Sequence, residues 1–418
     1  MTRELRGDGR VHERPMRGVN NAAPIRYVLS CIALGAVVGL GGCALPERRL
    51  AVPLELQEQA SVAGLPGIRY VVGGDMSEFM HEGRDSVKRE RALLAGAGHT
   101  TALPPANFLA LSGGGDDGAF GAGLLCGWTE AGTRPVFKVV TGISTGALIA
   151  PFAFLGSRYD AQLREVYTNI SSKDILEARW ALAAAFDDAV ADNAPLFRLT
   201  AKHVTEATLK DIAAEYAAGR LLLVATTNLD ARRAVIWNMT KIAASGHPNA
   251  LELFHRIMVA SAAIPGTFPP VMMDVETGGV TYQEMHVDGG AMAQVFIYPP
   301  GFKLKEQAAA AGTQRERRLY VVRNARLDPD WADVERRALT IAQRAITSLI
   351  HTQGIGDVVQ IYAIAERDGL DYNLAYIPPS FKAKHREDFD TAYMRQLFQL
   401  GYDLAAKGYP WLKKPPEF

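Results

Sequence analysis

The pentapeptide Gly142-Ile143-Ser144-Thr145-Gly146 carries the hydroxyl best placed for nucleophilic chemistry in this sequence. An apolar stretch precedes it, and Ala147-Leu148-Ile149-Ala150, which is compatible with a helix, follows it. A serine on a sharp turn from a strand to a helix is exposed at the edge of a sheet, and flanking glycines permit its strained backbone. We therefore expect Ser144 to be an acyl-transfer nucleophile, although a serine that only caps a helix would also suit this position.

A glycine-rich segment precedes this serine and contains Gly113-Gly114-Gly115 followed by Gly118. Such glycines let backbone N–H groups point into one concavity, where they can stabilise a developing oxyanion. The pattern also fits Gly-x-Gly-x-x-Gly of dinucleotide sites, but the next strand, ending at Thr141-Gly142, brings no carboxylate for a ribose. A phosphate-binding P-loop is excluded because no Gly-Lys-[Ser/Thr] follows. An oxyanion hole is the expected use, and a turn that only packs a strand against a helix is the alternative.

A serine hydroxyl needs a base to take its proton, and the sequence offers two kinds. Asp288, in Val287-Asp288-Gly289-Gly290, follows an apolar approach and sits on a glycine turn from which it could reach a facing loop. Burial would raise the basicity of such a carboxylate. A histidine is the other possibility, as in a triad of Ser144, Asp288 and His351. The histidines after Ser144, none in a telling motif, are His203, His247, His255, His286, His351 and His385.

Strands and helices are expected to alternate around these motifs. Apolar runs predict strands over 107–111, 136–140, 220–227, 234–239 and 319–322. Helices are expected over 119–130, 147–155, 159–167, 200–217, 255–263 and 331–352. In the last of these, Val334, Ala338, Ile341, Ala345 and Leu349 fall on one face. This alternation predicts an α/β fold with an open, largely parallel sheet that is covered on both faces.

The composition excludes several classes of function. The 418 residues contain 45 basic and 45 acidic side chains, so no net field favours nucleic acid. Three cysteines, Cys31, Cys43 and Cys126, make no disulfide framework. Nothing indicates a metal or an organic cofactor, and the oligomeric state is not specified by any pattern.

The N-terminal residues are typical of a bacterial export signal. Arg17 and Arg26 precede an apolar run from Tyr27 to Leu40, which is short for a membrane span. Leu40-Gly41-Gly42-Cys43 resembles a lipobox, in which the cysteine is acylated and becomes the mature N-terminus. We expect a lipid-anchored protein of the bacterial cell envelope, and the absence of Asp after Cys43 favours the outer membrane, facing the periplasm. An uncleaved anchor or an ordinary signal peptide is the alternative.

Four motifs in this order resemble the patatin-like phospholipases. They are Gly113-Gly114-Gly115-x-x-Gly118, Gly142-x-Ser144-x-Gly146, the segment from Ala260-Ser261 to Phe268-Pro269-Pro270, and Asp288-Gly289-Gly290. The resemblance covers about residues 107–300. It implies a three-layer α/β fold and hydrolysis of acyl esters, often in phospholipids or neutral lipids. It further implies a Ser-Asp dyad without histidine, with Ser144 as nucleophile, Asp288 as base and an oxyanion hole of the Gly113, Gly114 and Gly115 N–H groups.

One residue departs from that family pattern. Asp117 stands before Gly118, where the family usually has Arg or Lys. A carboxylate is tolerated at a helix N-terminus, but it must point away from the oxyanion. The alternatives left open are an α/β-hydrolase triad with His351 or His385 and a non-catalytic envelope lipoprotein that binds lipid or a protein partner.

The expected layout has four parts. They are a signal peptide over 1–42 with Cys43 lipidated, an extension over 43–105, a patatin-like catalytic domain over 106–330, and a mainly helical part over 331–418 that packs on the same domain.

Overall fold

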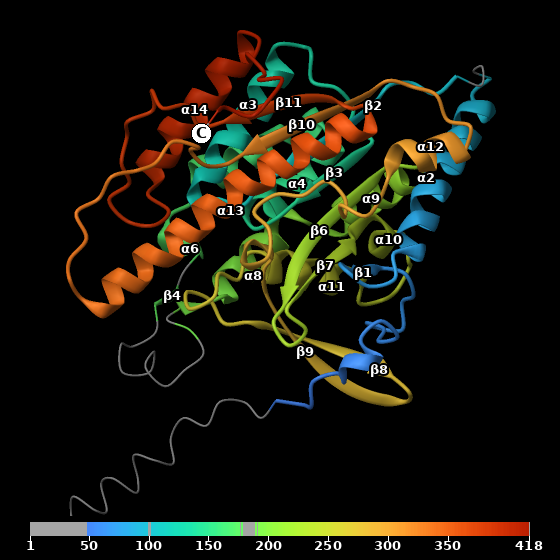
Figure 1. Ribbon diagram of the computed structural model, residues 1–418, viewed down its shortest axis with the longest axis horizontal. Coiled ribbons are helices and arrows are strands. Elements are labelled where there is room, and N and C mark those ends of the chain that lie inside the picture. Colours follow the sequence, from blue (N-terminus) through green and yellow to red (C-terminus); the bar gives the residue numbers. More distant parts are fainter. Residues whose placement is uncertain (1–47, 99–101, 176, 179–188, 190, 418) are drawn as a thin grey trace, which may run out of the picture. The chain divides into compact units, whose positions relative to one another are not determined.

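The structure is a computed structural model and describes residues 48–98, 102–175, 177–178, 189 and 191–417. The predicted signal peptide and Cys43 lie outside these residues. Apolar runs of the sequence form the strands of a central sheet (Figure 1). Its strands are β1 (Arg69–Val71), β2 (Ala106–Leu111), β3 (Val139–Gly142), β6 (Leu221–Asn228), β7 (Arg233–Asn238), β8 (Val271–Thr277), β9 (Val280–Asp288), β10 (Arg317–Arg323) and β11 (Asp371–Tyr376).

The middle of this sheet is parallel and one side of it is antiparallel. The strand order is β1-β7-β6-β3-β2-β10-β11, and every pair from β6 to β11 is parallel. The strands β1, β7, β9 and β8 extend the sheet by antiparallel pairing. A small separate ladder joins β4 (Glu177–Ala178) and β5 (Ala191–Asp192).

Helices cover both faces of the sheet because each buried strand presents apolar side chains to both sides. In β2, Leu109 and Leu111 belong to one buried cluster, whereas Phe108 and Ala110 belong to the other. The first cluster includes side chains of α3 (Gly118–Glu130), α4 (Thr145–Leu155), α5 (Asp160–Thr168), α6 (Ser172–Ile175), α8 (Ala194–His203), α9 (Glu206–Ala217), α10 (Met239–Ala243), α11 (Ala250–Ser261) and α14 (Thr391–Ala406). The second includes side chains of α2 (Ser77–Gly96), α12 (Leu304–Ala310) and α13 (Ala338–Asp368). The expected α/β class with a mostly parallel sheet between two helical layers is confirmed.

Strand β6 brings two other strands together end to end. On one edge it pairs with β3, in which Gly142 lies opposite Val224, and further along with β9, in which Asp288 lies opposite Thr226. Because β3 is parallel to β6 and β9 is antiparallel, the carboxyl ends of β3 and β9 approach each other. Two residues of strand span about 7 Å, so a residue just after Gly142 reaches the level of Asp288.

Several predicted elements differ from the observed ones at their boundaries. The strand expected over 136–140 is β3 at Val139–Gly142, and Val136 is exposed. The helix expected over 200–217 is two helices, because Thr205 caps α9 by accepting a hydrogen bond from the N–H of Thr208. The helix expected over 331–352 begins at Ala338 and continues to Asp368, and its expected apolar face is exposed.

Residues predicted to form an extension belong to the folded domain. Within 48–98, β1 pairs with β7, and α2 buries Phe79 against Tyr70 and Phe302. Periodicity is weak in this part of the sequence because β1 has three residues, and much of α2 is exposed. At the other end of the chain, β11 and α14 complete the sheet and the first helical layer.

Candidate active site

Ser144 occupies a strained turn between β3 and α4. Its φ is 55°, a left-handed value that is uncommon for residues other than glycine. The turn is tight because a Cβ atom on Gly142 would overlap the carbonyl of Gly146, and one on Gly146 would overlap the carbonyl of Leu111. The flanking glycines are therefore required by packing, as expected of a nucleophile elbow.

Asp288 lies directly opposite this serine. The Ser144 hydroxyl stabilises the ionised form of the Asp288 carboxyl group, and the N–H of Gly290 donates to its Oδ1 at 2.7 Å. Both residues are buried, with Ser144 6 % and Asp288 4 % exposed. Burial raises the pKa of Asp288 to about 7, although the Ser144 hydroxyl and the Gly290 N–H act to lower it. A carboxylate with that pKa is a far better proton acceptor than an exposed aspartate.

The segment after α11 holds both members of this pair. The hydroxyl of Ser261 accepts a hydrogen bond from the N–H of Ser144 at 3.1 Å and donates to the carbonyl of Ala225 at 2.7 Å. The carbonyl of Ala263 accepts from the N–H of Asp288 at 2.9 Å. The sequence motif that begins at Ala260-Ser261 thus holds the backbone of both Ser144 and Asp288.

The glycine loop reaches the same place from β2, but Gly113 does not contribute as predicted. Its N–H donates to the carbonyl of Gln294 at 2.9 Å, so in this arrangement it is not free to bind an oxyanion. The N–H groups of Gly114 and Gly115 meet no backbone acceptor in the described part of the chain. A Cβ on Gly113 would lie 3.2 Å from the Cβ of Ser144, which places the loop beside the serine.

The remaining motif glycines permit close contacts around the pair. A Cβ on Gly118 would overlap Thr145, and one on Gly289 would lie 2.6 Å from the carbonyl oxygen of Ala225. A Cβ on Gly290 would lie 2.9 Å from Nε2 of Gln294. At Gly289 the overlap is with backbone, so a side chain there would displace the turn from its place beside the pair.

The end of β10 clamps the glycine loop, and no sequence motif pointed to it. Arg323 donates from Nη1 to the carbonyl of Gly113 at 3.1 Å and to the hydroxyl of Ser112 at 3.2 Å. Asn324 donates from its backbone to the Ser112 hydroxyl at 2.8 Å and from Nδ2 to the Ser112 carbonyl at 2.9 Å. Burial lowers the pKa of Arg323 to about 10, although Asp357 and Asp117 oppose that effect. The loop is therefore held by a buried cation and an amide.

Asp357 and Gln294 tie this site to α13. The Asp357 carboxylate accepts from the N–H of Gln294 at 2.5 Å, and Gln294 donates from Nε2 to the carbonyl of Gly290 at 2.8 Å. Gln294 thus contacts both the glycine loop and the aspartate turn. In the sequence, only its position four residues after Gly290 could have suggested that Gln294 belongs to the site.

The unusual Asp117 points away from the serine. Its Oδ1 accepts a hydrogen bond from the hydroxyl of Tyr393 on α14, and burial raises its pKa to about 6. The adjacent Asp116 accepts from His385 Nδ1 at 3.1 Å and from the N–H of Phe389 at 3.2 Å. Both carboxylates therefore face α14 and the segment before it.

Histidine takes no part in the contacts of the pair. Among the described residues, no histidine is hydrogen-bonded to Ser144 or Asp288. His286, although close in sequence to Asp288, contacts Thr226 and Glu284 instead. In the same part of the chain no group of three or more His, Cys, Asp or Glu side chains could hold a metal ion.

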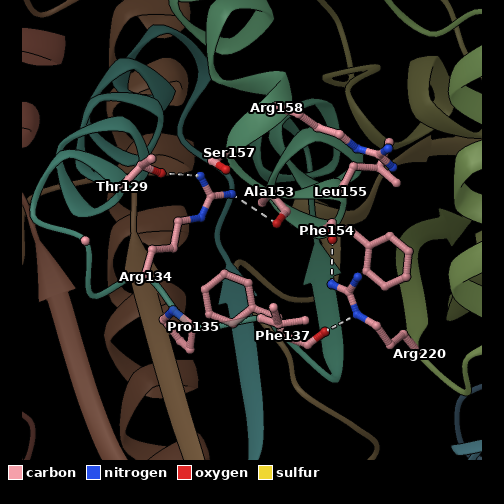
Figure 2. Close-up of a pocket in the computed structure, with 13 residues that line it drawn as sticks. Thr129, Arg134, Pro135, Phe137, Ala153, Phe154, Leu155, Ser157, Arg158 and Arg220 are labelled. Atoms are coloured by element: carbon pink, nitrogen blue, oxygen red, sulfur yellow. Dashed lines mark hydrogen bonds between the residues drawn. The ribbon is translucent and has the colours of Figure 1, made fainter. Parts of the chain in front are cut away.

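A cavity of about 410 Å³ lies at the far end of α4 from Ser144 (Figure 2). Arg134 and Arg220 donate there to the carbonyl oxygens of Ala153 and Phe154, at 3.0 and 2.5 Å, and so satisfy the C-terminal end of the helix. The charges of the arginines at this cavity are balanced by the pairs Arg134–Asp160, Arg158–Asp211 and Arg220–Glu215. The arginines at this cavity therefore hold the C-terminal end of α4, the helix that follows Ser144, and each of them already has an acidic partner.

The residues of the site lie within a segment that matches a family model. Residues 109–299 match the family model Patatin-like phospholipase, which includes the glycine loop, Ser144 and Asp288. The match identifies a patatin-like phospholipase domain over these residues, which make up a little less than half of the chain. No curated protein matches the sequence.

Two solved structures are distantly similar. VipD from Legionella pneumophila has 12 % identity and a TM-score of 0.36, with 73 % of this chain and 67 % of VipD covered. ExoU of the Pseudomonas aeruginosa type III secretion system, in complex with SpcU, has 13 % identity and a TM-score of 0.30. That match covers 73 % of this chain and 52 % of ExoU, so the chain spans about half of the length of ExoU.

Proposed function

We propose that the protein is a serine acyl-ester hydrolase that acts on lipids through a Ser144–Asp288 dyad. The observation that carries this proposal is the Ser144 hydroxyl acting on the buried carboxyl group of Asp288, whose pKa is raised to about 7. Histidine is not needed, because such a carboxylate can accept the serine proton directly near neutral pH.

The reaction proceeds in two steps through an acyl-enzyme. Ser144 Oγ attacks the ester carbonyl carbon while its proton passes to Asp288, and the N–H groups of Gly114 and Gly115 bind the oxyanion. The intermediate collapses, and the alcohol leaves with the proton from Asp288. Water then attacks acyl-Ser144 and gives a proton to Asp288. Release of the fatty acid returns that proton to Ser144 Oγ.

Two variants test the dyad. Ser144→Ala and Asp288→Asn should each abolish hydrolysis of p-nitrophenyl butyrate by the purified chain, and Ser144→Ala should also prevent labelling by a fluorophosphonate probe. Ser157→Ala, which removes an exposed hydroxyl at the far end of α4, is the matched control and should keep both properties. Undiminished hydrolysis by either dyad variant would disprove the mechanism. A wild-type chain that neither hydrolyses esters nor takes the label would favour a non-catalytic lipid-binding protein.

We further propose that Cys43 is acylated and holds the domain at the bacterial outer membrane, facing the periplasm. The support is the sequence Leu40-Gly41-Gly42-Cys43 after an apolar run. Several acyl chains on one cysteine would anchor the protein stably, whereas one chain would bind only reversibly. Metabolic labelling with an alkyne fatty acid should mark the wild-type chain but not Cys43→Ser, and label retained by that variant would exclude this anchor.

A further inference from the structure

The N-terminal half of α13 exposes an unusual number of apolar side chains. Residues 338–353 contain one residue among Asp, Glu, Lys and Arg, namely Arg344. Leu349 is 70 % and Ile346 57 % exposed. Contiguous apolar surface of this kind on a folded domain marks an interaction site. We call it the α13 apolar face and define it by the exposed residues Ile341, Ala342, Ala345, Ile346, Leu349 and Ile350.

The α13 apolar face points away from the domain because the apolar residues lie on different sides of the helix in its two halves. The C-terminal half buries Val358, Ile361 and Ala365 against the sheet. At 3.6 residues per turn, the apolar residues of the N-terminal half are rotated from those by about a third of a turn. The half-buried residues of this half are accordingly polar, namely Thr340, Arg344, His351 and Gln353, and Arg344 pairs with Asp330 at 2.9 Å. The apolar arc is left uncovered along about 15 Å of helix.

The residues of α13 that follow this face contact the segment after Asp288. Gln353 donates from Nε2 to the carbonyl of Met292, whose side chain is 41 % exposed. One turn further along, Asp357 accepts from Gln294, which holds the glycine loop. Figure 1 shows the N-terminal end of α13 at the margin of the domain. The helix that carries the α13 apolar face therefore also contacts the segment that holds the glycine loop.

We propose that the α13 apolar face inserts into the surface of the lipid bilayer from which the acyl-ester substrate is drawn. This inference rests on the proposed function. A helix with one apolar and one polar face lies in the plane of the interface, and no helix of the described residues is long and apolar enough to cross a bilayer. The proposed anchor lies five residues before Arg48, where the described chain begins. Five extended residues span about 17 Å, so a bilayer is within reach of the domain.

A local probe tests insertion separately from the anchor. Cys31 and Cys43 are replaced by Ser in the full chain, and Ile346→Cys is labelled with a polarity-sensitive fluorophore. Vesicles of phosphatidylethanolamine and phosphatidylglycerol should shift its emission to shorter wavelength. Val136→Cys, which labels another exposed apolar position, 73 % exposed at the cavity at the far end of α4, is the control and should not shift. Equal emission of the Ile346 probe with and without vesicles would overturn the proposal.

A kinetic comparison separates docking from catalysis. The double variant Ile346→Ser/Leu349→Ser should hydrolyse soluble p-nitrophenyl butyrate as the wild type does but should lose about tenfold or more of its rate on a vesicle-embedded phospholipid. Val136→Ser should leave both rates unchanged. Equal loss on both substrates, or no loss on vesicles, would overturn the docking proposal while the dyad remains testable on the soluble ester. A wild-type dimer that the double variant converts to monomers, with vesicle hydrolysis retained, would assign the face to a second copy of the chain instead.

Discussion

Replacing Asp288 by Asn should abolish ester hydrolysis and, above pH 7, make the fold more stable. The pKa of Asp288 is raised by burial from 3.8 to about 7, which is about three pH units. Each unit corresponds to about 1.4 kcal/mol, so ionising this carboxyl group costs about 4 kcal/mol more in the folded protein than in the unfolded chain. Asparagine has nearly the same shape and carries no charge, so it avoids this cost while keeping an oxygen for the N–H of Gly290.

The gain in stability of Asp288→Asn over the wild type must increase with pH. Below pH 4 the carboxyl group is protonated in both states and contributes no difference. Between pH 4 and 7 only the unfolded chain ionises, so the wild type loses stability as the pH rises, and above pH 7 the loss is complete. The advantage of Asp288→Asn in free energy of unfolding should therefore grow by about 3 kcal/mol between pH 5 and pH 8.5.

Urea unfolding of both proteins at these two pH values measures this growth, and p-nitrophenyl butyrate hydrolysis measures the accompanying loss of activity. The control Asp274→Asn removes a carboxylate that is 53 % exposed and should change stability by less than about 1 kcal/mol at either pH. A stability difference between wild type and Asp288→Asn that is the same at pH 5 and pH 8.5 would refute the argument from burial. The wild-type rate should also fall about tenfold per pH unit below pH 7, as Asp288 becomes protonated.

Three further substitutions probe the support of the site. Glu284→Gln leaves the buried Arg69 without the carboxylate that it contacts at 2.5 Å. The free energy of unfolding in urea should therefore fall by about 3–5 kcal/mol. A loss below about 1 kcal/mol would contradict the argument that this ion pair is buried. Gly114→Ala places a Cβ against the backbone carbonyl of Asn324, so kcat for the soluble ester should fall about tenfold or more, and unchanged kcat would rule out a role for the loop geometry. Arg323→Met removes the cation that holds the loop and should lower kcat more than it raises KM, while Arg323→Lys should restore part of kcat; a change in KM alone would indicate a different role.

The sequence by itself determined the local parts of this protein. Buried strands such as β2 are continuous apolar runs, and glycines mark both the elbow at Ser144 and the loop at Gly113 to Gly118. These patterns can be recognised from residues close together in the chain, although the atoms that require the glycines, such as the Asn324 carbonyl beside Gly114, come from distant segments. Periodicity and turn chemistry could therefore predict the strand-helix order and the α/β class.

Only the tertiary structure decided how the distant parts meet. Asp288 faces Ser144 because β9 pairs antiparallel with β6 just beyond the end of β3, a register that no local pattern contains. The same packing occupies the Gly113 N–H with Gln294 and turns Asp117 toward Tyr393. In α13, the periodicity of residues 338–349 predicts an apolar face, but whether that face is buried depends on the angle at which the rest of the helix packs on the sheet. Contacts between segments far apart in sequence set the geometry and the pKa of the site, because burial and register are properties of the assembled fold.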